Sequence, residues 1–88
     1  MDYKNIANIF KALGDETRLQ IVDMLKSGTM CACKLLEKFE ITQPTLSYHM
    51  KMLVDSGLVE CEKRGIWNNY KINKEKFDEL SNFILLNE

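Results

Sequence analysis

The apolar residues of this chain change their spacing at Gly57, and this change constrains the fold more than any other feature. Before Gly57 they recur three and four residues apart, which is the spacing of helices. After it, residues 58–63 and 66–72 alternate as two strands around Arg64-Gly65, a turn signal. Helical spacing returns over 74–86. The pattern predicts a mainly α domain of the α+β kind, with the order α-α-α-α-β-β-α.

Local chemistry marks where the helices before Gly57 begin. Asp15 and Thr42 are expected N-caps, because their side-chain oxygens accept hydrogen bonds from the unpaired amides of a first helical turn. Pro44 suits such a turn, where the amide that proline lacks would have no partner. Leu19 and Leu25, with Ile21 and Val22, are expected to form the buried stripe of the second helix. The predicted helices cover 4–13, the segment between Asp15 and Gly28, 31–39 and 42–56.

The two middle helices are short and tightly joined, and a hairpin follows them. Residues 31–56 are therefore predicted to form a helix-turn-helix and residues 58–72 a two-stranded wing, in one winged helix-turn-helix domain over 1–88. The second helix of the pair carries small hydrogen-bonding groups near its start, which suits the major groove of DNA. An ordinary amphipathic surface helix is the alternative. The expected DNA contacts are Gln43, Thr45, Ser47, Tyr48 and Lys51, with Lys63 and Arg64 at the wing tip reaching flanking phosphates.

Charge and composition narrow the function classes. The net charge is −1, and residues 42–74 carry five Lys or Arg against three Asp or Glu, an excess that an ordinary solvated surface explains equally well. An enzyme is not expected, since the chain has one histidine, no glycine-rich phosphate loop and no paired carboxylates. A winged helix used only for protein–protein contact stays open as a second class, and salt dependence separates it from DNA binding.

No segment is predicted to span a membrane or to direct export. The run Phe83-Ile84-Leu85-Leu86 is far shorter than the roughly 20 apolar residues of a spanning helix, and the start of the chain has no signal-peptide pattern. A cytoplasmic location is expected, with the three cysteines as reduced thiols. Helix 74–86 is more apolar than a lone terminal helix of a small monomer, so a partner subunit is expected.

Several stretches, taken together, resemble one known family. They are Phe10 to Leu25, with Gly14-Asp-Glu-Thr-Arg18 inside it, Cys31-Ala-Cys-Lys-Leu-Leu36, Thr42-Gln-Pro-Thr-Leu-Ser-Tyr-His-Met-Lys-Met-Leu53, Ser56-Gly-Leu-Val59 and the wing from Arg64 to Ile72. In this order they are similar to the ArsR/SmtB family of metal- and metalloid-responsive repressors. The resemblance implies a homodimer joined through helices 4–13 and 74–86. It also implies binding to double-stranded palindromic operator DNA without a cofactor, and release when an effector binds.

The resemblance gives two cysteines a role. Cys31 and Cys33 match the Cys-x-Cys of the family's arsenic, antimony, cadmium and lead sensors, and soft thiolates favour such ions. Side chains two apart on a regular helix point about 200° apart, so ion binding is expected to distort the first turn of helix 31–39. Three interpretations stay open: a two-cysteine As(III) or Sb(III) site completed by an outside ligand, a redox switch of the pair, and cysteines without a sensing role.

Other residues depart from the family pattern. Leu36 stands where the arsenic-sensing type often has a third cysteine, and the last helix has no histidine, so a zinc site is not expected there. Cys61, at the start of the wing, is expected to be a small buried thiol. His49 occupies the family's Ser-x-His-Leu position and is expected to pack or hydrogen-bond at the edge of the core rather than bind a metal.

Overall fold

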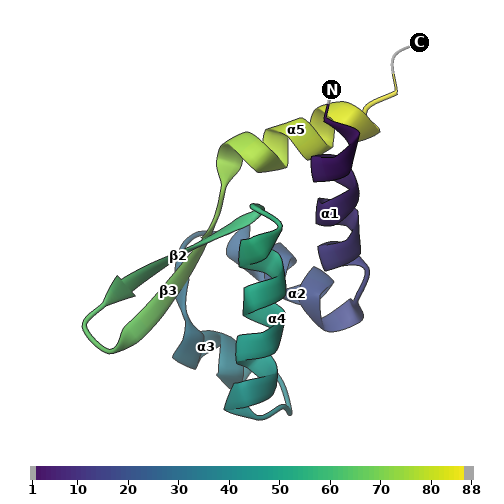
Figure 1. Cartoon of the computed structure of the whole chain (residues 1–88). Helices are drawn as coiled ribbons and strands as arrows, with labels where there is room; N and C mark the ends of the chain where they lie inside the picture. The colour runs from purple at the N-terminus through teal and green to yellow at the C-terminus, as the bar shows by residue number, and fades with distance from the viewer. Residues whose placement is uncertain (1, 87–88) are drawn as a thin grey trace.

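The computed structural model describes residues 2–86 and has five helices and three strands in that range (Figure 1). The winged helix-turn-helix predicted from the sequence is confirmed, with one strand added. None of the helices in the described range has the length and apolarity needed to cross a membrane. The elements are α1 (Tyr3–Leu13), α2 (Glu16–Leu25), β1 (Met30–Cys31), α3 (Ala32–Glu37), α4 (Gln43–Asp55), β2 (Val59–Arg64), β3 (Trp67–Ile72) and α5 (Lys74–Ile84).

Capping side chains set the starts of α2 and α4. Asp15 Oδ2 accepts a hydrogen bond from the Arg18 amide (3.1 Å), and Thr42 Oγ1 accepts one from the Thr45 amide (3.3 Å). Gly57 ends α4 with a φ of +84°, in the left-handed region that glycine adopts without a Cβ clash. Both predicted caps and this helix end are confirmed.

β3 is the central strand of a three-stranded antiparallel sheet. β2 and β3 form the hairpin, with Arg64 opposite Trp67 at its tip. β1 pairs with the other edge of β3, where Cys31 lies opposite Asn69, so the predicted two-stranded sheet is corrected to three strands. A two-residue strand is too short to show alternation in a sequence. The added strand takes Cys31 out of α3, which begins at Ala32.

Side chains from all five helices and from β2 and β3 form one core. In α2 the buried stripe consists of Ile21, Val22 and Leu25, whereas Leu19, which was expected in it, is 53% exposed. At about 100° per residue, Leu19 lies about 60° beyond Val22, just outside the arc that these three residues share. The most deeply buried large side chains are Ile9, Ile21, Leu35, Met50, Leu53, Leu58 and Val59.

α1 and α5 lie together at one end of the molecule, away from the first turn of α4 (Figure 1). The rings of Phe10 and Phe83 meet edge to face with centroids 5.9 Å apart, and Asn5 Nδ2 donates a hydrogen bond to Glu79 Oε2 (3.3 Å). Both rings stay partly exposed. At the end of α5, three further apolar side chains are mostly exposed, so this surface is uncovered in the single chain: Ile84, Leu85 and Leu86.

Candidate functional site

α4 has one buried face and one exposed face. Leu46, Met50 and Leu53 enter the core. Because these contacts hold α4 from one side only, its opposite face can enter a groove of DNA without loss of core packing. The exposed face holds the α4 residues that the sequence predicts to contact DNA: Gln43, Thr45, Ser47, Tyr48 and Lys51.

The remaining predicted DNA contacts lie at the tip of the wing, which projects away from the helices (Figure 1). Lys63 and Arg64 end β2, and the turn that follows contains Gly65 with a φ of +65°. Arg64 Nε lies 3.4 Å from Glu62 Oε1, in an exposed ion pair. Exposed pairs of this kind contribute little stability, so a phosphate can compete with the carboxylate for the guanidinium.

A disulfide joins Cys31 and Cys33. Cys31 is the N-cap of α3, with extended backbone angles (φ −78°, ψ 155°), and its sulfur accepts a hydrogen bond from the Lys34 amide (3.4 Å). The expected divergence of the two side chains is wrong, because only Cys33 is helical. Their Cα atoms lie 5.4 Å apart, and the sulfurs meet without unwinding of α3. The expectation of reduced thiols is likewise wrong for this pair in the structure.

A hollow of about 190 Å³ opens between α3, α4 and β3. It brings Cys33 together with Gln43 and Ser47, two of the residues predicted to contact DNA. Trp67 and Tyr70 of β3 form another wall of the hollow, and no sequence signal indicates their position there. One member of the cysteine pair and part of the candidate DNA-reading surface therefore share a cavity.

Cys61 does not belong to this cluster. It is exposed on β2, so the expectation of a buried thiol is wrong: β2 leaves the core after Val59, and every later residue of the strand is exposed. Cys61 lies opposite Tyr70, whose pKa is raised mainly by burial and further by the neighbouring thiol. Within residues 2–86, no three Cys, His, Asp or Glu side chains form a group that could hold a metal ion.

His49 lies at the edge of the core with a side chain 13% exposed, and it hydrogen-bonds as predicted. Its Nδ1 accepts a hydrogen bond from Arg18 Nη1 (3.0 Å) and lies 3.8 Å from Asp15 Oδ2. Arg18 is not among the residues predicted from the sequence to have a role. Its position three residues after the Asp15 cap is the only signal that could have indicated it, because the contact with His49 spans 31 residues.

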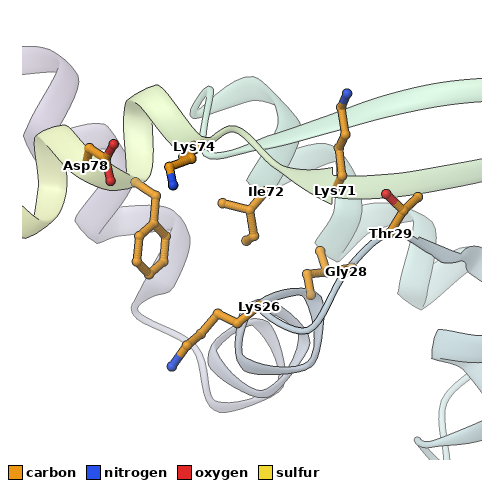
Figure 2. A pocket seen from close by; sticks show the side chains of 9 residues that line it. Lys26, Gly28, Thr29, Lys71, Ile72, Lys74 and Asp78 are labelled. Atoms are coloured by element: carbon orange, nitrogen blue, oxygen red, sulfur yellow. The ribbon is translucent and has the colours of Figure 1, made fainter.

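A larger hollow, of about 450 Å³, lies between the end of α2, the end of β3 and the start of α5 (Figure 2). Ile72 and Phe77 contribute apolar walls, and lysines surround them. Figure 2 shows the amines of Lys26 and Lys71 directed to opposite sides, so they do not converge on one point. None of its lining residues is a predicted DNA contact or a cysteine. The candidate functional site therefore consists of α4, the wing tip and the cysteine pair.

The chain matches the family model for bacterial regulatory proteins of the arsR family over residues 15–60, from the cap of α2 into β2. It is also similar to the arsenical resistance operon repressor of Staphylococcus xylosus, with 48% identity over 81 residues. That match covers 92% of this chain and 78% of the relative. The region matched by the family model, residues 15–60, includes the cysteine pair and the whole of α4.

Solved structures share the fold. The crystal structure of an ArsR family transcriptional regulator superposes with a TM-score of 0.87 at 27% identity, covering 96% of this chain and 87% of that one. A homodimeric winged helix-turn-helix DNA-binding domain from Mycobacterium bovis gives a TM-score of 0.79 at 26% identity, covering 91% and 75%. The chain therefore belongs to the arsR family of bacterial regulatory proteins and has the winged helix-turn-helix fold of its relatives.

Proposed function

We propose that this chain is a homodimeric transcriptional repressor that binds operator DNA and leaves it when As(III) or Sb(III) binds Cys31 and Cys33. The observation that carries the proposal is the hollow in which Cys33 meets Gln43 and Ser47. A change at the cysteine pair would therefore take place next to the residues through which α4 would read DNA. The similarity to an arsenical resistance operon repressor supports the choice of ion.

In this proposal α4 lies in the major groove and the wing reaches the flanking backbone. Gln43 can make paired hydrogen bonds to adenine, and Thr45 and Ser47 can bond bases or phosphates. Lys51 and the wing-tip cations neutralise phosphates. The uncovered apolar surface of α1 and α5 supports self-association at the opposite end of the molecule, which leaves both copies of α4 free.

The proposed signal acts through the sulfurs. In the reduced pair, two thiolates offer the soft ligands that As(III) and Sb(III) prefer. A ligand from outside the protein completes the site, because no third Cys, His, Asp or Glu side chain of residues 2–86 joins the pair. The Lys34 amide, which points at Cys31 Sγ, favours the thiolate there. An ion held by both sulfurs occupies space beside α4, and it induces release if it binds the DNA-free conformation more tightly than the DNA-bound one.

Fluorescence anisotropy with duplex DNA from upstream of the chain's own gene tests the DNA-binding half. We expect the reduced protein to retain this duplex over a scrambled one, with an affinity that falls steeply as salt rises, because phosphate contacts release counterions. Equal, salt-insensitive binding to both duplexes would instead favour a protein-interaction module.

A titration of the reduced protein with arsenite, antimonite, cadmium and zinc tests the sensing half. We expect a saturable sulfur-to-metal absorption band with As(III) or Sb(III), and a change in the fluorescence of Trp67, the single tryptophan, which lines the same hollow as Cys33. The double variant Cys31→Ser/Cys33→Ser should lose both signals. The control Cys61→Ser should keep them, and their loss there would indicate a three-thiolate site instead.

The disulfide supports a second candidate signal, oxidation of the pair. A hydroperoxide would accept two electrons and two protons from the two thiols, and its O–O bond would break to give an alcohol and a water (two waters from hydrogen peroxide), while one S–S bond forms. In this case DNA affinity should fall after peroxide treatment without any ion, and dithiothreitol should restore it. Unchanged affinity of the oxidised protein would exclude this signal.

A further inference from the structure

Arg18 connects three helices through one guanidinium group. Its Nε donates to the Ala12 carbonyl in the last turn of α1 (2.6 Å), and its Nη1 donates to His49 Nδ1 on α4 (3.0 Å). Its own backbone amide is held by the Asp15 cap (3.1 Å). The guanidinium is thus anchored at the α1–α2 turn and extends to the helix that carries the candidate DNA-reading residues.

The contact with Arg18 assigns a role to one ring nitrogen of His49. A guanidinium has only donors, so in this hydrogen bond Nδ1 must be the acceptor, which requires an imidazole that carries its proton on Nε2. On α4 the ring lies between exposed Tyr48 and buried Met50, which puts it at the boundary between the exposed face and the core. The bond therefore restrains the rotation of α4 about its own axis.

We propose that Arg18 and neutral His49 are positioning residues for DNA binding, and that a proton on His49 turns α4 away from its DNA-reading orientation. This inference rests on the proposed repressor function. A proton on Nδ1 removes the acceptor and places a positive charge against Arg18. Asp15, with Oδ2 3.8 Å away, then becomes the favourable partner. Protonation of the ring should therefore lower DNA affinity.

The surroundings of His49 offer few competing charges. α1, α2 and β2 pack against α4, and in residues 2–86 the only charged side chains within ion-pair or hydrogen-bond distance of the ring are Asp15 and Arg18. Its nearest aromatic neighbour is Tyr48 (ring centroids 5.7 Å). A histidine without a positioning role would add positive charge beside DNA on protonation and strengthen binding. The two roles therefore predict opposite pH effects.

The tautomer is measured first, without DNA. Because His49 is the only histidine in the chain, nitrogen NMR of the imidazole reports on one ring. At about pH 7.5 we expect a protonated Nε2 and a bare Nδ1 in the wild type. Arg18→Met should change the Nδ1 signal. The matched control Lys26→Met, which removes the cation at the C-cap of α2, should not, because in residues 2–86 Lys26 forms an ion pair with Asp23 alone. A protonated Nδ1 in the wild type would overturn the link.

DNA affinity is then measured by anisotropy at about pH 7.5 and about pH 5.5, at constant ionic strength and with folding checked by circular dichroism. We expect wild type and Lys26→Met to bind upstream DNA about tenfold more weakly at the lower pH, the effect of losing one charge-assisted hydrogen bond. His49→Gln, whose amide oxygen can still accept from Arg18, should bind equally at both. Arg18→Met should be weakened at both.

The outcomes separate this inference from the proposed function. Sequence-specific binding by the wild type that stays constant or strengthens at the lower pH would overturn the positioning role alone, as would a His49→Gln variant that keeps the wild-type pH response. Failure of the wild type to prefer upstream over scrambled DNA at the higher pH would overturn the repressor function itself.

Discussion

Lys51 Nζ and Asp55 Oδ2 lie 2.8 Å apart on the exposed face of α4. Both side chains are largely exposed, so the pair contributes little to folding. It nevertheless sets a negative charge beside the Lys51 amine. In the repressor proposed above, DNA must compete with this carboxylate for Lys51.

We therefore expect Asp55→Asn to bind all DNA sequences roughly two- to fivefold more tightly, which is the range of an exposed ion pair. The matched control is Asp23→Asn, which removes the same charge from the exposed Lys26–Asp23 pair of α2 (3.3 Å). Anisotropy with specific and scrambled duplexes measures both. Equal gains in the two variants would show that net charge, not Lys51, is responsible.

Replacement of Gln43 and of Lys51 by alanine should have different effects on DNA binding. Lys51→Ala should weaken binding to every sequence and reduce the salt slope by about 1, because one phosphate contact is lost. Gln43→Ala should relax discrimination at one base pair, by about 1–3 kcal/mol. Binding to a set of single-base operator variants measures this. A uniform loss in both variants would mean that Gln43 does not read a base.

Charge placed on the uncovered end of α5 should separate the subunits of the proposed dimer. Ile84 is 61% exposed, so Ile84→Glu should leave the chain folded while it opposes burial of this surface against a second copy. Sedimentation should change from dimer to monomer. Ile66→Glu at the wing, where Ile66 is 86% exposed, is the control that should stay dimeric. Dissociation of both variants, or of neither, would place the interface elsewhere.

The cap of α2 should contribute to stability only above acidic pH. The Arg18 amide, together with the charge of Arg18 and that of His49 when its ring is protonated, holds the pKa of Asp15 below its ordinary value of 3.8 despite some desolvation. Because the folded pKa is the lower one, this stability is present above pH 3.8 and is lost as the pH falls through the folded value. Urea midpoints measured across this range should fall more steeply for wild type than for Asp15→Asn. Parallel curves would contradict the linkage.

The features of this protein that depend on neighbouring residues can be predicted from the sequence. The caps at Asp15 and Thr42, the end of α4 at Gly57 and the hairpin turn at Gly65 are all where local chemistry predicts them. Each depends on backbone groups within a few residues, and such interactions leave a pattern that can be read along the chain. The exposed face of α4 is readable for the same reason, because helical period alone separates it from the core face.

The contacts between residues far apart in the chain cannot be predicted in this way, because they depend on the tertiary fold. Cys31 is extended because β1 pairs with β3, and in this conformation its sulfur reaches that of Cys33. In the helix expected from the sequence, the two side chains would point apart. Cys61 is exposed because β2 leaves the core after Val59. The residue types of β2 do not indicate at which residue the strand leaves the core. The bond from Arg18 to His49 joins residues 31 apart. No local preference encodes these partners, since each contact depends on how whole elements pack and on the sheet register that packing selects.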